Sequence, residues 1–414
     1  MELTAGIDIP ARRGAMIKRD WEPSVEALGG RQARRGFSYE AYLPAEISSE
    51  GFLLNSDIAA AGSNAELACR ELNDDPPELA NFETLARQLL RAESVASSRI
   101  EGLILSHRRL AKAAFSSQVH DITTQSMMAN IRALEHAVEL ASTVEELKRE
   151  HFLEVHRILF EGTRDEHVGG QLREEQGWIG GSASSPLHAE FIPPPSEFVG
   201  DLLDDLCTFC NRNDLPAAIQ AAIAHVQFET IHPFFDGNGR TGRALILIIL
   251  RRRGLAKSYL PPVSLALAGE ADRYVAGLTS WRIGDEDDWY TVFIDALFRA
   301  AKGARRFATE VSGLQERWFQ EAGNPRKNSG ARRLIELLPS QPIINVKTAT
   351  QLLGGSGERA RLAINRLEQA GVLRCTTVGR GARAWECVGL FDLLDHFERE
   401  LGPPGRTPHP SRGS

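Results

Sequence analysis

The feature that most constrains this chain is a polar loop that leads directly into an aliphatic run. The loop spans His232–Arg243 with the sequence HPFFDGNGRTGR, and Ala244–Leu250 adds seven aliphatic residues. Because such a run is stable only in a core, we expect the loop to enter the first turn of a buried helix. The sequence therefore predicts a set of polar groups held at one helix N-terminus.

The residue types of this loop suit a bound anion. Gly237, Asn238 and Gly239 tolerate the positive φ values that turn successive backbone N–H groups into an anion-binding nest. The nest lies at a helix N-terminus, where the helix dipole also favours a phosphate. Arg240 and Arg243 are three residues apart, so both project from one side of the helix and can bind phosphate oxygens.

Two more side chains of the loop carry chemistry. Asp236 directly precedes the nest, where a carboxylate can hold a divalent cation that bridges phosphate oxygens. His232 has the ordinary pKa best suited to proton abstraction near neutral pH. The alternative is a glycine-rich turn that caps a buried helix and carries two surface arginines, but it leaves the spacing of all these groups unexplained.

The loop resembles the signature of the Fic family, HxFx(D/E)GNGRxxR, and matches it at every defined position. The resemblance implies a helical core that transfers AMP from ATP to a hydroxyl group of a protein. It implies His232 as the general base, Asp236 as the ligand of Mg²⁺ and Arg243 as the contact to the terminal phosphate. The full set of nucleotide-binding residues that it implies in the loop is Asp236, Gly237, Asn238, Gly239, Arg240, Thr241, Gly242 and Arg243.

A second short match lies at the end of a helix expected over Leu79–Ile100. Ser97, Glu101 and Gly102 fit the pattern (S/T)xxxE(G/N), which by itself is an ordinary helix end with a glycine cap. In many Fic proteins this motif packs beside the nucleotide site, and the resemblance implies that Glu101 pairs with Arg243. Since a carboxylate in that guanidinium fork competes with the γ-phosphate, we expect an autoinhibited protein.

Two short extended runs flank a turn-rich tip over residues 182–188 and predict a β-hairpin, with an irregular connector as the alternative. In the family this place is the flap, which clamps a target segment by main-chain strand addition. The resemblance implies Phe191, Ile192 and Pro193 as the docking residues of the flap. Because strand addition is nearly blind to side chains, the target protein cannot be identified this way.

The adenine pocket matches the family only in part. Family members commonly carry paired tyrosines after the core helix, the first of which lies over the adenine. This chain has Arg273 followed by Tyr274. We expect Tyr274 to supply the ring, with stacking by Arg273 as the alternative.

The C-terminal region resembles a winged helix-turn-helix. From Arg326 to Leu390 the chain has eleven Lys and Arg against four Asp and Glu, a local charge of +7 in a chain of net charge −7. That asymmetry favours DNA contact, with Ser356–Ala370 as the recognition helix and Arg380 in the wing. The alternative is a winged helix that serves protein contact, which leaves a homodimer open.

The remaining composition gives few signals. Cys207 and Cys210 form a C-x-x-C within a stretch of helical periodicity and without a second pair, so we expect buried free thiols rather than a zinc or redox site. The aliphatic run of seven residues is too short to span a membrane, and residues 1–35 lack a secretory signal. We therefore expect a cytoplasmic protein with no membrane partner.

Domain boundaries follow from these assignments and from proline and glycine breaks. The predicted parts are a flexible N-terminus (1–35), an N-terminal helical region with the inhibitory helix (36–120), the Fic catalytic core (121–300), a linker helix (301–325), the winged helix-turn-helix (326–402) and a disordered tail (403–414). The fold class is mainly α, a helical Fic core with a small β-hairpin flap, followed by the winged helix.

The sequence therefore predicts a protein adenylyltransferase that uses ATP as co-substrate and Mg²⁺ as cofactor, and is autoinhibited by Glu101. Two alternatives stay open. The same site could remove AMP or transfer another nucleotidyl or phosphoryl group, with Glu101 orienting a water molecule. Alternatively, the chain could be a DNA-binding regulator in which the Fic core senses a nucleotide.

Overall fold

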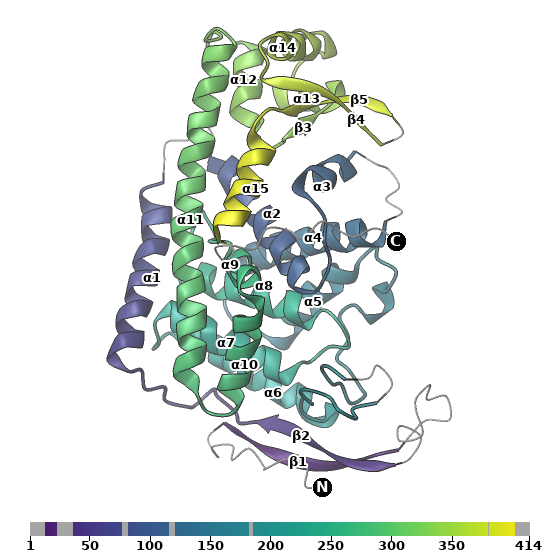
Figure 1. The fold of residues 1–414 in the computed structure, drawn as a ribbon, viewed down its shortest axis with the longest axis vertical. Coiled ribbons are helices and arrows are strands. Elements are labelled where there is room, and N and C mark those ends of the chain that lie inside the picture. The colour runs from purple at the N-terminus through teal and green to yellow at the C-terminus, as the bar shows by residue number, and fades with distance from the viewer. Residues whose placement is uncertain are drawn as a thin grey trace. The chain divides into compact units, whose positions relative to one another are not determined.

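The computed structural model describes residues 13–22, 36–76, 82–115, 121–181, 185–379 and 381–401. These residues form a mainly α-helical protein, as predicted, and they also contain two small antiparallel sheets (Figure 1). The elements are β1 (Gly14–Trp21), β2 (Phe37–Pro44), α1 (Ser56–Asp74), α2 (Phe82–Ile100), α3 (His107–Ala113), α4 (Ile122–Thr143), α5 (Arg149–Phe160), the 3₁₀ helix η1 (Glu166–Val168), α6 (Ser196–Cys210), α7 (Ala217–Ile231), α8 (Asn238–Arg252), α9 (Val263–Gly269), α10 (Ala271–Arg282), α11 (Glu286–Glu321), α12 (Gly330–Leu337), β3 (Ile343–Ile344), α13 (Val346–Leu353), α14 (Gly357–Gln369), β4 (Leu373–Val378), β5 (Ala382–Cys387) and α15 (Leu390–Leu401).

The chain divides into two compact units. The first unit combines residues 1–63, 132–253 and 272–294, and the second combines residues 64–131, 254–271 and 295–414. Within the described residues, no helix has both the length and the hydropathy of a membrane span. Cys207 and Cys210 are buried free thiols, which confirms that part of the sequence analysis.

Helices α7 and α8 form the buried centre of the first unit. Every residue of α7 is buried, and α8 is buried from Arg240 to Leu250. The two helices approach closely at Gly242, where a Cβ atom would lie 2.7 Å from a carboxylate oxygen of Glu229. Helix α7 ends before Pro233, which has no N–H group to continue the helix.

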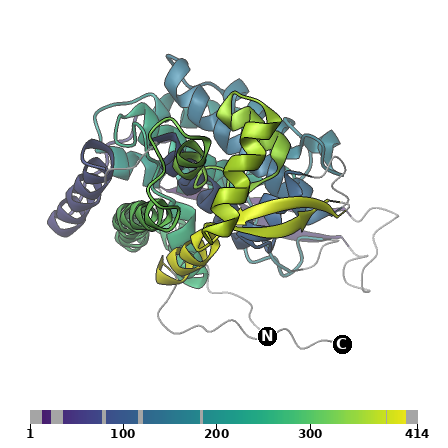
Figure 2. The same cartoon turned by 90° about the horizontal axis from the view of Figure 1, so that it is seen from above.

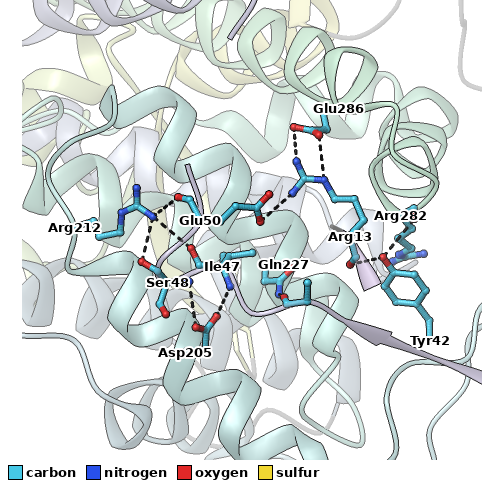
Figure 3. Close-up of polar contacts among 11 residues, drawn as sticks. Arg13, Tyr42, Ile47, Ser48, Glu50, Asp205, Arg212, Gln227, Arg282 and Glu286 are labelled. Carbon is cyan, nitrogen blue, oxygen red and sulfur yellow. Dashed lines mark hydrogen bonds and ion pairs between the residues drawn. The ribbon is translucent and has the colours of Figure 1, made fainter. Parts of the chain in front are cut away.

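The first unit also contains a β-hairpin that the sequence analysis missed. Strand β1 pairs antiparallel with β2 from Gly14 opposite Pro44 to Trp21 opposite Phe37. The prediction that residues 1–35 are flexible is therefore wrong for Gly14–Trp21. The hairpin is anchored at Tyr42, whose hydroxyl donates to the carbonyl of Arg13 at 2.7 Å, and Arg13 in turn pairs with Glu286 (Figure 3).

In the second unit, a three-stranded sheet packs with three short helices. The strand order is β3-β5-β4, with both pairs antiparallel, and α12, α13 and α14 gather beside the sheet (Figure 1). Seen from above, the β4–β5 hairpin projects past the helices (Figure 2). Arg380, the predicted wing residue, and the predicted tail over 403–414 lie outside the described residues.

Helix α11 runs through one predicted boundary. It is a continuous helix of 36 residues, so residues 300 and 301, where we placed the end of the catalytic core, lie inside it. Gly303 lies within α11 and permits close packing with α15, since a Cβ atom there would lie 2.9 Å from Leu401. The same contact region holds Phe307 and Phe397, whose rings stack at 4.8 Å.

Candidate active site at the N-terminus of helix α8

The loop before α8 presents a helix N-terminus for an anion. Gly237 is the N-cap with φ 77°, and the first helical N–H to find an acceptor in α8 is that of Thr241, which donates to the Gly237 carbonyl at 3.0 Å. The N–H groups of the turn before it have no intrahelical acceptor, by the geometry of any helix. We predicted positive φ at three residues, but of these only Gly237 has it, while Asn238 and Gly239 open the helix.

Gly237 cannot be exchanged for a larger residue without moving its neighbours. A Cβ atom at this position would lie 2.8 Å from the ring of Phe160 and 3.0 Å from Leu159. Both neighbours belong to α5, which packs against the entry to α8. The glycine is therefore required by the left-handed backbone and by the close approach of α5 together.

Asn238 holds the loop rather than offering its side chain to a ligand. Its Oδ1 accepts the N–H of Phe234 at 2.8 Å, and its Nδ2 donates to the carbonyl of Phe234 at 2.8 Å. The residue is 3% exposed. The carboxamide of Asn238 therefore shapes the loop, and its backbone N–H, the group that the predicted nest uses, remains for a phosphate.

Asp236 keeps an accessible carboxylate beside the helix N-terminus. Its Oδ1 accepts the N–H of Gly237 at 2.6 Å, its Oδ2 lies 3.4 Å from Nη2 of Arg240, and its side chain is 61% exposed. Across the described residues, no group of three or more His, Cys, Asp or Glu forms a preformed metal site. Mg²⁺ commonly takes one or two carboxylates and completes its shell with water and substrate phosphates, so a single exposed Asp236 fits this ion.

His232 caps α7 in a left-handed conformation, with φ 50° and ψ 61°. Its N–H donates to the carbonyl of Phe228 at 2.9 Å, and its own carbonyl accepts Nε of Arg173 at 2.8 Å. Left-handed φ values are uncommon for residues other than glycine and persist where the surroundings fix them. The main chain of His232 is thus held on both sides.

Three residues of the signature face the interior of the first unit. Thr241 and Arg243 are each 1% exposed, and Gly242 lies against Glu229 of α7. Thr241 and Gly242 thus take part in helix packing, and their nucleotide contacts stay a prediction. Arg243 is desolvated, which strengthens any hydrogen bond that its guanidinium makes.

Tyr274 packs in the core of the first unit. Its hydroxyl lies 2.8 Å from Nε2 of His225, the two rings stack at 5.9 Å, and Tyr274 is 3% exposed. The ring of Tyr274 is therefore covered by its neighbours, and its adenine contact stays a prediction. Arg273, the alternative, is exposed.

The predicted inhibitory motif lies at the end of α2, in the second unit. Gly102 has φ 79°, and its N–H donates to the carbonyl of Arg99 at 2.9 Å, which confirms the glycine cap. Ser97 is fully buried and Glu101 is exposed. Since Arg243 belongs to the first unit, its pairing with Glu101 stays a prediction.

Within the described residues, the region of the predicted flap hairpin contains the β-bridge between Ile179 and Phe191, and residues 182–184 of its tip lie outside them. Ile179 and Phe191 exchange both main-chain hydrogen bonds, at 2.8 and 3.2 Å. The carbonyl of the next residue, Ile192, accepts the N–H of Tyr42 from β2 at 2.9 Å. Pairing does not continue through Pro193 and the prolines after it, because proline has no N–H group to donate.

His156 of α5 is a site residue whose role the sequence analysis missed. Its Nε2 contacts the carbonyl of Asp236 at 2.9 Å, its Nδ1 accepts the N–H of Gly170 at 2.9 Å, and its ring stacks on Phe234 at 3.7 Å. Burial lowers the pKa of His156 to about 4, so the neutral ring can donate and accept at once.

Two family models match this chain. Residues 146–250 match the Fic/DOC family, and residues 59–139 match the Fic/DOC family N-terminal region. The first match contains the whole signature loop. Over these two regions the chain is therefore similar to the Fic/DOC family.

Curated relatives include protein adenylyltransferase fic-1 of Caenorhabditis elegans, 32% identical over 149 residues, which is 35% of this chain and 26% of the relative. The Caenorhabditis briggsae protein of the same name is 34% identical over 143 residues, 34% of this chain and 25% of the relative. The match thus spans about a quarter of these relatives. A solved Fic family protein from Desulfovibrio desulfuricans G20 aligns with TM-score 0.48 and 20% identity over 82% of this chain and 98% of that chain.

Proposed function

We propose that the first unit transfers AMP from ATP to a hydroxyl group of a target protein. The observation that carries this proposal is the N-terminus of α8, where Gly237 opens the helix at positive φ beside the Asp236–Arg240 pair, inside the Fic/DOC match. First-turn N–H groups, which have no acceptor within the helix, and a nearby guanidinium suit the phosphates of ATP. The curated relatives that match over about a third of the chain are named protein adenylyltransferases.

The transfer forms one bond and breaks one. The target hydroxyl oxygen bonds to the α-phosphorus of ATP, the bond from that phosphorus to the bridging oxygen breaks, and pyrophosphate leaves. His232 takes the proton of the hydroxyl. The N-terminus of α8, Arg240 and Arg243 stabilise the negative charge on the phosphate oxygens. Mg²⁺ held by Asp236 would neutralise part of that charge.

We further propose that Glu101 restrains this reaction by pairing with Arg243. A charge-assisted hydrogen bond of this kind contributes about 1.5–3 kcal/mol. Each 1.4 kcal/mol is tenfold in an equilibrium, so the productive pose of ATP would be depopulated by roughly ten- to a hundredfold.

The test is incorporation of AMP from ATP labelled at the α-phosphate, in lysate, by the wild type, Glu101→Gly and the double variant Glu101→Gly with His232→Ala. Glu101→Gly should label roughly ten- to a hundredfold faster than the wild type. Adding His232→Ala should then lower the rate by about 10²–10⁴ and leave ATP binding intact. A double variant as active as Glu101→Gly contradicts the mechanism. Glu101→Gly that labels no faster, together with release of AMP from modified protein, would indicate AMP removal instead.

A second candidate function, DNA binding, rests on a hollow in the second unit. The hollow has a volume of about 460 Å³. It is lined by three cationic side chains, two carboxamides and two apolar residues, namely Lys347, Arg361, Arg383, Asn345, Asn365, Trp385 and Val346. Arg361 and Asn365 are exposed on one face of α14, four residues apart, and guanidinium and carboxamide groups are those that bind base edges in the major groove. Helix α14 is the predicted recognition helix.

A further inference from the structure

Arg173 binds the main chain on both sides of the candidate active site. Its Nε donates to the carbonyl of His232 at 2.8 Å, and its backbone N–H donates to the carbonyl of Pro233 at 3.0 Å. Its Nη2 contacts the carbonyl of Ile231 at 3.4 Å and also donates to that of Pro194, which follows the flap. One side chain therefore joins the loop that carries the general base to the segment that carries the flap.

Arg173 is buried, so its guanidinium needs these hydrogen bonds to offset the free-energy cost of leaving water. The residue is 6% exposed, and burial lowers its pKa to about 10, so it is still charged at neutral pH. A buried guanidinium is stable only when its N–H groups find acceptors. Its acceptors are main-chain carbonyls, including those at the negative end of the α7 dipole.

The link from Arg173 to the flap is short and stiff. Pro194 stands three residues after Phe191, which pairs with Ile179. Prolines fix their own φ, so the chain between the two positions has little freedom to absorb a displacement. Gln176 supports the same segment, because its Nε2 donates to the carbonyl of Pro193 at 2.8 Å.

We propose that Arg173 is a positioning residue that couples the flap to the general base. It holds the carbonyls of His232 and Pro194 in a fixed position relative to each other. A target segment docked on the flap therefore lies at a constant distance from His232. The planar fork of arginine can serve both carbonyls at once, whereas a lysine ammonium has no such fixed geometry. The proposal rests on the proposed function for the roles of His232 and the flap.

Arg212 provides a matched control within the same unit. Its Nη1 also donates to main-chain carbonyls, those of Glu50 at 2.7 Å, Ser48 at 3.2 Å and Ile47 at 3.3 Å (Figure 3). These carbonyls belong to the segment after β2 and not to the signature loop. Arg212→Lys therefore removes the same kind of interaction without touching the coupling.

The first test is hydrogen exchange of the full chain, which does not use the reaction. In Arg173→Lys and Arg173→Met, the amides of His232 and Phe191 should both exchange faster, by roughly tenfold or more, the factor for one lost hydrogen bond. Arg212→Lys should leave both amides unchanged. Faster exchange at only one amide, or at neither, overturns the coupling. In the wild type, increasing urea should lower the protection of both amides in parallel, and independent opening would overturn the proposal without any substitution.

The second test separates positioning from nucleotide binding. Arg173→Lys should lower kcat for AMP incorporation by about 10²-fold, the effect of a misplacement near 1 Å. Its KM for ATP should change by less than about threefold, because the N-terminus of α8 is unaltered. Arg173→Met should be slower than Arg173→Lys. Equal losses in both variants, or a loss confined to KM, contradict a positioning role. If neither the wild type nor Glu101→Gly transfers AMP, only the proposed function fails, and the exchange test still decides the coupling.

Discussion

Asn238 and Phe234 are joined by two hydrogen bonds of 2.8 Å, one in each direction, between the carboxamide of Asn238 and the main chain of Phe234. The first residue of α8 therefore closes the loop that precedes it. Asn238 is 3% exposed, so water does not compete for either bond. The shape of the anion site depends on a side chain that leaves only its backbone N–H for the anion.

We expect Asn238→Ala to destabilise the protein and to weaken ATP binding. The substitution leaves the buried N–H and carbonyl of Phe234 without these bonds, at a cost of about 1–3 kcal/mol. Asn238→Asp should be intermediate in stability, since it keeps the acceptor and loses the donor. Urea unfolding and calorimetry with ATP measure the two effects. An Asn238→Ala protein with wild-type stability and affinity would show that the loop holds its shape without the clamp.

Gly237 tests the packing of the same loop. Gly237→Ala places a methyl group 2.8 Å from the Phe160 ring in a left-handed backbone. Gly162 is the matched control, because it also has a left-handed φ of 72° but has no atom within 4 Å of its Cβ position. Both alanines bear the backbone strain, and we expect Gly237→Ala to cost about 1–3 kcal/mol more, with weaker ATP binding. Equal unfolding midpoints for the two variants would contradict the packing argument.

The helices were predictable because their signals are local. The aliphatic run Ala244–Leu250 lies within buried α8, as predicted. Strand β1 was not predictable in this way. Its partner strand lies more than fifteen residues away, and its charged residues interrupt the alternation of apolar and polar side chains that is typical of a strand. Lys18 stands opposite Glu40, a pair of opposite charges that becomes visible only once the register is known.

The site was predictable in its residue types and less so in their roles. The signature placed His232, Asp236 and Gly237 together, and the structure has them in one loop. Contacts between residues far apart in the sequence were not predicted. His225 of α7 contacts the hydroxyl of Tyr274, and Arg173, in a separate loop, donates to the carbonyl of His232. Such partners depend on tertiary packing, so spacing within the signature contains no information about them.

His225 gives a pH dependence of stability. Burial, aided by the charge of Arg243, lowers the pKa of His225 to about 3, against an ordinary value of 6.5. As the pH falls, His225 therefore binds a proton near pH 6.5 in the unfolded chain and only near pH 3 in the folded protein. The stability that comes from this difference is present above pH 6.5 and is lost progressively as the pH falls toward 3.

We expect His225→Gln to flatten this dependence. The variant should be less stable than the wild type at pH 7.5, and the difference should shrink by up to about 1.4 kcal/mol per pH unit below pH 6.5. Urea unfolding between pH 7.5 and 4.5 measures it, and other titrating groups cancel in the comparison. His167→Gln, at an exposed histidine, should run parallel to the wild type. A constant difference between His225→Gln and the wild type would contradict a buried neutral His225.

The cationic hollow of the second unit predicts a salt dependence of DNA binding. If Lys347 and Arg361 each neutralise a phosphate, replacing both by Gln should reduce the slope of log affinity against log salt by about 1.8, at roughly 0.9 per phosphate. Arg333→Gln removes a charge from α12 at an exposed residue paired with Glu336, outside the hollow, and should leave the slope unchanged. Titration of duplex DNA at several salt concentrations measures the slopes. Equal slopes for all proteins would exclude the hollow as the DNA contact. A general effect of net charge would instead lower the slope in Arg333→Gln as well.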